Sequence, residues 1–119
     1  MALSVGAPTA QAATQTTKAA ANCKASGDRY YCHNRAGAPV YSRGDHPVVI
    51  DHLRTTYSWF VCRKEGAKNN NSPQHPTRWE WTKGDDHGKW GWVKDGDIAD
   101  ETNPLPRMKG FFVSCPWNL

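Results

Sequence analysis

Three observations predict that this chain forms one small all-β domain. Its 119 residues suffice for a single core. From Tyr30 onward, short runs of β-branched and aromatic residues recur at about ten-residue spacing and are separated by turn residues. No helix-period segment exceeds a few turns, and no apolar run approaches the ~20 residues that cross a bilayer. The pattern favours a compact β-barrel or sandwich.

The first predicted strands follow from residue type. Residues 38–42 and 48–53 are short apolar runs, and residues 57–63 form the densest aromatic and β-branched run. That density predicts a central strand buried on both faces. Residues 66–76 hold three consecutive Asn and two Pro, which predicts an exposed loop.

A hairpin is predicted next. Residues 78–83 and 88–93 both alternate aromatic with other residues, and the turn-forming residues 84–87 separate them. Trp79 and Trp81 should share one face of their strand, and Trp90 and Trp92 one face of theirs. An acidic turn with a 3₁₀ turn near residues 95–98 follows, and residues 111–115 are the last predicted strand.

The amino-terminal residues indicate export. Residues 1–12 resemble the end of a signal peptide, because Ala10-Gln11-Ala12 is an A-x-A cleavage signature with Pro8 just upstream. Residues 13–22 carry no large apolar side chain and are expected to be a flexible tail, or a segment that folds on a partner. The structured domain is expected over residues 23–119, in a protein secreted to the extracellular space.

Four cysteines in an exported chain favour disulfides over metal. Neither C-x-x-C nor H-x-x-x-H occurs, which argues against zinc, and no cofactor is expected. Of three possible connectivities we favour Cys23–Cys32 with Cys62–Cys115, although the spacing alone leaves the choice open. Each bridge would contribute on the order of 2–4 kcal/mol.

Charge is uneven along the chain and excludes several functions. Ten Lys/Arg stand against four Asp/Glu up to Arg78, and five against seven afterwards. The Trp-rich half is thus the acidic one, which argues against nucleic acid. The acidic residues 95–101 depart from the EF-hand pattern and are expected to lie on a solvated turn. Pairs such as Asp51-His52 and Asp86-His87 lack a nucleophile motif, so no catalytic residues are predicted.

The aromatic residues are the strongest candidates for binding. A barrel of this size can bury two or three indoles, so at least one is expected at an exposed rim, since each large ring covers roughly 150–250 Å² when buried. Exposed Trp and Tyr suit a shallow groove for a macromolecule. Polar residues of the following loop could complete that groove. The candidate binding residues are Tyr57, Trp59, Trp79, Trp81, Trp90, Trp92, Asn70 and His75.

The order of these elements resembles the bacterial SH3-like (SH3b) domain, in the cysteine-containing form of small secreted actinobacterial proteins. The resemblance covers about residues 36–106 and rests on the runs at 38–43, 48–53 and 57–66, and on Gly91-Trp92-Val93. Residues 42–45 and Asp97-Ile98 depart from the family pattern. The resemblance implies a small SH3-like β-barrel of five to six short strands, whose members mostly bind peptides, peptidoglycan or partner proteins.

These observations predict a secreted, non-catalytic binding module. The first hypothesis is an adaptor or accessory subunit that binds another secreted protein, with residues 13–22 adding a strand to the partner's sheet. Adaptor subunits of umbrella-type toxin particles are similar in size and organisation. The second hypothesis is a peptidoglycan-binding cell-wall module, and the third is a secreted enzyme inhibitor or small antagonistic effector.

Overall fold

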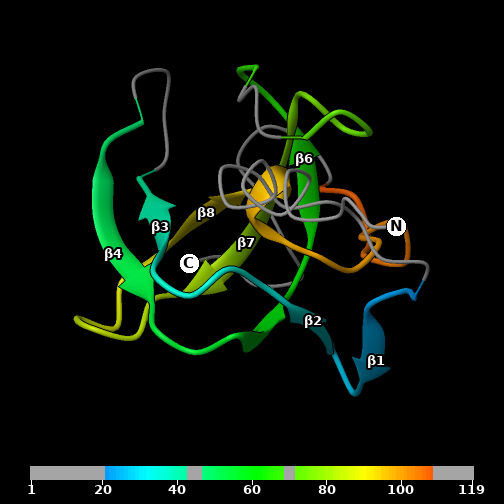
Figure 1. Cartoon of the computed structure of the whole chain (residues 1–119), viewed down its shortest axis with the longest axis horizontal. Helices are drawn as coiled ribbons and strands as arrows, with labels where there is room; N and C mark the ends of the chain where they lie inside the picture. The colour runs from blue at the N-terminus through cyan, green and yellow to red at the C-terminus, as the bar shows by residue number, and fades with distance from the viewer. Residues whose placement is uncertain (1–20, 43–46, 69–71, 109–119) are drawn as a thin grey trace, which may run out of the picture.

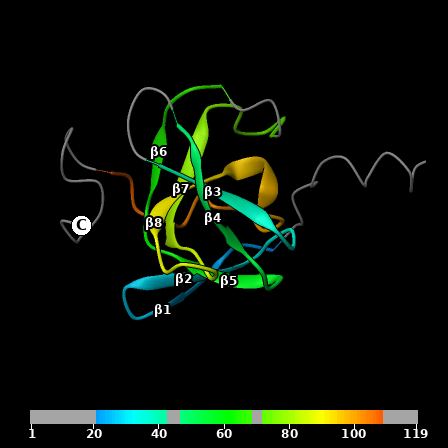
Figure 2. The ribbon, with the colours of Figure 1, turned by 90° about the vertical axis from the view of Figure 1, so that its left-hand side faces the viewer.

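Eight short strands and one 3₁₀ turn are the regular elements of residues 21–42, 47–68 and 72–108, the part of the chain that the computed structural model describes. They form two antiparallel sheets, shown one below the other in Figure 2. The smaller sheet has the order β1 (Lys24–Ser26), β2 (Arg29–His33) and β5 (Tyr57–Phe60). The larger has the order β4 (Val49–Leu53), β3 (Ala38–Tyr41), β8 (Trp90–Lys94), β7 (Arg78–Lys83) and β6 (Arg63–Glu65).

The predicted all-β class is confirmed for the described residues, but their two sheets do not close into the predicted SH3-like barrel of five to six strands. The run 57–63, expected as one strand, bends at Val61 and Cys62 and divides into β5 and β6 (Figure 1). Hydrogen bonds from Val61 N–H to the Trp81 carbonyl and from Trp81 N–H to the Cys62 carbonyl, both 2.9 Å, hold the bend against β7. β5 then pairs with β2 in the smaller sheet, and β6 pairs with β7 in the larger sheet. The chain therefore passes from one sheet to the other at this bend, and neither sheet closes into a barrel.

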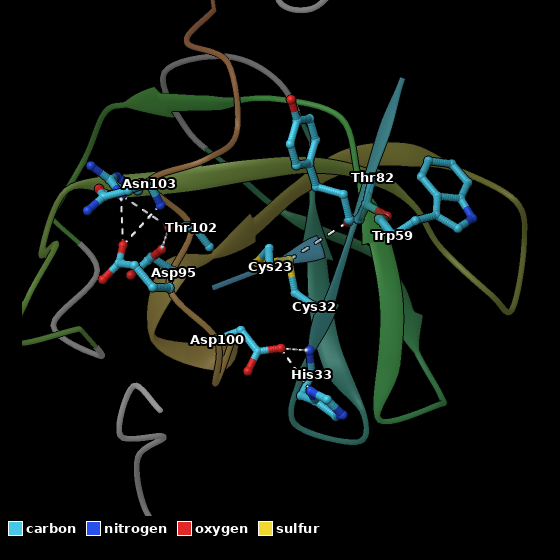
Figure 3. The surroundings of a disulfide bond; sticks show 12 residues. Cys23, Cys32, His33, Trp59, Thr82, Asp95, Asp100, Thr102 and Asn103 are labelled. Carbon is cyan, nitrogen blue, oxygen red and sulfur yellow. Dashed lines mark hydrogen bonds and ion pairs between the residues drawn. A yellow bond between two sulfur atoms is a disulfide. The ribbon is translucent and has the colours of Figure 1, made fainter. Parts of the chain in front are cut away.

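The β1–β2 hairpin was not predicted from the sequence. Gly27, with φ +64°, begins the two-residue turn that joins its strands. The disulfide Cys23–Cys32 links the start of this hairpin to β2, which confirms the predicted pair (Figure 3). Ala21 and Asn22, predicted to lie in the tail, pair with Glu101, so the folded domain includes them.

The predicted tryptophan hairpin is confirmed as β7 and β8. Trp81 lies opposite Trp92, and Lys83 lies opposite Trp90. Directly opposed residues of antiparallel strands project from the same face. Since positions two apart also share a face, all four indoles of the hairpin lie on a single face of the larger sheet.

Two hydrophobic clusters lie on opposite faces of the larger sheet. The first lies between the sheets and comprises Cys23, Cys32, Ala38, Val40, Leu53, Phe60, Val93, Ile98 and Leu105. The second, here called the tryptophan cluster, comprises Val61, Cys62, Trp79, Trp81 and Trp92, with Tyr41, Trp59, Trp90 and Met108 packed against it. Five of the six residues of β7 are buried, because a cluster covers each face of this strand. The run of residues 57–63 was predicted to be the strand buried on both faces, but that strand is β7.

The remaining predictions divide between confirmed and untested. The predicted 3₁₀ turn is η1 (Asp95–Asp97). Cys62 is fully buried and is not a free thiol. Its predicted partner Cys115, the predicted last strand and residues 1–20 lie outside the described residues, so one disulfide has both cysteines in the described part of the chain.

Candidate functional site

The outer face of the smaller sheet carries a continuous row of aromatic and basic side chains. In β2 the inner side chains are Tyr30 and Cys32, which face the core, so Arg29, Tyr31 and His33 project outward. Strand pairing sets Tyr31 opposite Trp59 and His33 opposite Tyr57. We call the outward set, Arg29, Tyr31, His33, Tyr57 and Trp59, the aromatic face.

The rings of the aromatic face contact one another. The centroid of Tyr57 lies 5.7 Å from that of Tyr31 and 4.5 Å from that of His33. The Arg29 guanidinium carbon lies 4.0 Å from the centroid of Trp59, in a cation–π contact. Tyr57 is 44% exposed, one of the most exposed large apolar residues of the described chain. An outer sheet face is ordinarily polar, so this one is unusual in composition.

An acidic segment beneath the sheet fixes the position of His33. Oδ2 of Asp100 accepts hydrogen bonds from the His33 backbone N–H at 2.7 Å and contacts its Nδ1 at 2.8 Å (Figure 3). Two residues further along, the Arg35 side chain donates to Asp97 at 3.0 Å. These contacts hold the end of β2, and the His33 ring with it, against η1 and the residues that follow it.

The same segment corrects the prediction of a solvated acidic turn. Asp95, Asp97 and Asp100 are buried. Asp95 accepts hydrogen bonds from the hydroxyls of Ser72 at 2.8 Å and Thr102 at 2.6 Å. These carboxylates therefore join loops to the sheets, and the described residues contain no group of three or more metal-ligating side chains.

The hairpin tryptophans lie elsewhere than predicted. Trp79, Trp81 and Trp92 are 5%, 1% and 3% exposed, so they form the interior of the tryptophan cluster rather than an exposed rim. The prediction counted one core, whereas the second cluster on the opposite face provides burial for the additional rings. Trp90 is half-buried and bridges the two regions, with centroids 6.1 Å from Trp81 and 5.5 Å from Trp59.

Of the two loop residues predicted to complete the groove, the structure describes His75, which does not join the aromatic face. His75 turns toward the domain, with Nε2 2.9 Å from Oε2 of Glu101. Asn70 lies outside the described residues. Of the eight predicted binding residues, the structure places Tyr57 and Trp59 on the aromatic face, with Trp90 beside Trp59.

Arg29, Tyr31 and His33 were not among the predicted binding residues. The sequence feature that could have identified them is the alternation in Arg29-Tyr30-Tyr31-Cys32-His33. Because the disulfide residue Cys32 faces the core, the residues at positions 29, 31 and 33 face outward. A shallow pocket of about 170 Å³ opens beside Tyr57 and Trp59, with Thr55, Thr82 and Lys83 also in its wall. Its size suits a single side chain inserted next to the aromatic rings.

The aspartate–histidine pairs have structural roles at the hairpin turn. The Asp51 carboxylate accepts backbone hydrogen bonds from His52, Asp86, His87 and Lys89. Arg54 hydrogen-bonds Asp86 and thereby lowers the pKa of that carboxyl. These carboxylates are already occupied by fold contacts.

No helix of the described residues is long and apolar enough to span a membrane.

Comparisons of the chain with protein-family models, curated proteins and solved structures found no match. The SH3b resemblance therefore rests on the sequence motifs alone.

Proposed function

We propose that this protein is a secreted, non-catalytic binding module that acts as an adaptor or accessory subunit by contacting another secreted protein through its aromatic face. The observation that supports this proposal is the register of β2 and β5, which gathers Tyr31, Tyr57, Trp59 and Arg29 on one surface. Tyr, Trp and Arg are the residue types that contribute most binding energy at protein interfaces.

Preorganisation of the face also supports the proposal. His33 is held by Asp100, and the Arg29 guanidinium lies against Trp59. Side chains already fixed before binding lose less conformational entropy in the complex. The pocket beside Tyr57 would accept one side chain of the partner.

Export, the second disulfide and the family assignment belong to the same proposal. The Cys23–Cys32 bridge is typical of proteins in oxidising compartments, which supports secretion. We propose Cys62–Cys115 as the second bridge and an SH3b-related fold for the domain. Residues 13–20 would add a strand to the partner's sheet, and membership of a toxin complex would be one setting for such an adaptor.

Peptidoglycan is the second candidate ligand. Lys24 lies opposite Tyr31 in the strand register, so it adds a second positive charge beside Arg29 on this side of the sheet. Two cations beside a row of rings complement an anionic cell wall. Secreted inhibitors and effectors would use the same face against an enzyme.

The test is co-purification of the tagged protein from the culture medium of the organism that makes it, alongside sedimentation with purified cell walls. We expect a stoichiometric protein partner whose affinity falls about thirtyfold in Tyr57→Ala, the loss typical of a central interface aromatic. Val48→Ala is the matched control, because Val48 is 61% exposed and lies outside the aromatic face. Equal losses in both variants would contradict the proposed site.

Two further variants separate the alternatives. Deletion of residues 13–20 should weaken partner binding if the tail adds a strand, and unchanged binding would overturn that part of the proposal. Sedimentation with cell walls that is lost in Tyr57→Ala, without any protein partner, would replace the adaptor by the peptidoglycan module.

A further inference from the structure

β6 lies away from β2 and β5, the two strands of the aromatic face (Figure 2). A second cluster of basic residues lies on this side of the domain. A pocket of about 170 Å³ opens there and is lined by Arg63, Lys64, Glu65, Arg107 and Met108. Three of its five lining residues are cations. This surface has no role in the proposed function.

Backbone pairing forces the two arginines together. Arg63 N–H donates to the Pro106 carbonyl at 2.9 Å, and Met108 N–H donates to the Arg63 carbonyl at 2.8 Å. These bonds form a parallel bridge in which Arg63 and Arg107 are partners. Paired residues of a bridge project from the same side, and both arginines line the pocket.

These two arginines differ from the other arginines that the structure describes. Arg35, Arg54 and Arg78 each pair with a carboxylate, and Arg29 lies over Trp59. Within residues 21–42, 47–68 and 72–108, neither Arg63 nor Arg107 has an ion pair with a carboxylate. Burial and the neighbouring charges of Arg78 and Arg107 lower the pKa of Arg63 by more than Glu65 and Glu80 raise it.

The acidic residue of the pocket is already occupied. Glu65 accepts a hydrogen bond from the Thr77 hydroxyl, and its Oε2 lies 3.6 Å from Nε of Arg78. Lys64 places its Nζ 4.3 Å from the centroid of Trp92. The Nε of Arg63 donates to the Leu105 carbonyl at 2.9 Å, which orients its guanidinium. The pocket therefore retains an excess of positive charge on a preorganised donor.

We propose that the pocket lined by Arg63, Lys64 and Arg107 binds a small phosphate group. One guanidinium group can engage both oxygens of a carboxylate in two parallel hydrogen bonds. Two guanidinium groups need more acceptor oxygens, which a tetrahedral phosphate dianion supplies. The lining holds three cations and one carboxylate, and this excess of two positive charges matches the charge of a phosphate dianion. Met108 supplies the apolar wall against which the rest of a small ligand would pack.

Calorimetric titration of the full chain with inorganic phosphate, at constant ionic strength, tests this site. We expect saturable binding that weakens about tenfold in Arg107→Gln, as for loss of one charge-assisted contact. Arg107 is exposed, so this variant should fold. Lys89→Gln removes an equal charge at an exposed position outside both pockets and should bind as the unmodified protein does. Equal weakening in both variants, or no binding at all, would overturn the proposal.

The ligand class has its own readout. Phosphate should shift the NMR signals of the Arg63 Nε–H and the Arg107 backbone N–H, and acetate at the same concentration should bind at least tenfold more weakly. Equal affinity for acetate would overturn the assignment to phosphate. Shifts confined to other residues would place the anion elsewhere and overturn the site.

Discussion

The Asp51 carboxylate holds the turn between β7 and β8, and Asp51→Asn should destabilise the domain. Its Oδ1 accepts backbone N–H bonds from His52 at 2.8 Å and Asp86 at 2.9 Å. Its Oδ2 accepts two more, from His87 and Lys89, both at 3.0 Å. Asp51 is 1% exposed, so water cannot substitute for a lost acceptor.

The magnitude follows from counting these donors. Asparagine replaces one of the two oxygens by an amide NH₂, so two of the four N–H groups lose their acceptor and face a donor. Each unsatisfied buried group costs roughly 1–3 kcal/mol. Allowing for relaxation of the turn, we expect Asp51→Asn to lower the free energy of unfolding by about 2–4 kcal/mol.

The same contacts give the loss a pH dependence. Burial is the largest single influence on the pKa of Asp51 and raises it. The four backbone hydrogen bonds together lower this pKa by more than burial raises it, so it lies below the ordinary value of 3.8. A depressed pKa contributes stability that is complete above the ordinary carboxyl range and is lost as pH falls through the folded-state value. The difference between wild type and Asp51→Asn should therefore be largest near pH 7 and shrink below about pH 4.

Urea unfolding at pH 7 and pH 3 measures both effects. Asp28→Asn is the matched control, because Asp28 is exposed and should change the stability by less than about 0.5 kcal/mol. If Asp51→Asn also stays within about 0.5 kcal/mol at pH 7, or its deficit does not depend on pH, the account of this turn is wrong.

Two further stability predictions use the same assay. A methyl group on Gly84 would collide with the Asp51 side chain, so Gly84→Ala should lower the free energy of unfolding by about 1–3 kcal/mol. In Gly66→Ala the nearest neighbour of the new methyl group would lie 3.4 Å away, so this control should lose less stability. Similar losses in the two variants would argue against the predicted collision. Replacing Cys23 and Cys32 together by Ser should cost about 2–3 kcal/mol, because the bridge closes a short loop over a sequence separation of 9, and a loss below about 1 kcal/mol would contradict its stabilising role. Peptide mapping without reduction should recover Cys62 linked to Cys115, and a free thiol at either would refute that pair.

Local patterns predicted much of the larger sheet. The alternation of residues 78–83 and 88–93 gave the β7–β8 hairpin, because strand periodicity and turn residues are local properties. The run 57–63 was recognised as extended but not as bent. The bend depends on the pairing of Val61 and Cys62 with Trp81, a contact between distant segments that local pattern does not contain.

The aromatic face was predicted only in part. Tyr57 and Trp59 were identified by residue type, but the burial of Trp79, Trp81 and Trp92 required knowledge of a second cluster on the opposite face of the larger sheet. The hairpin β1–β2, which brings Tyr31 and His33 beside Tyr57, was hidden in a segment interpreted mainly as a disulfide loop. Which residues share an outer face follows from strand register, and the register is set by tertiary pairing.

Site-specific photo-crosslinking would show whether the aromatic face contacts the partner. A photoreactive phenylalanine analogue would replace Tyr57 in one variant and Val48 in another, both of which are exposed positions. After irradiation in culture medium or with purified cell walls, the account predicts a covalent adduct to one secreted protein from position 57 and none from position 48. An adduct from position 48 alone, or the same products from both positions, would contradict it.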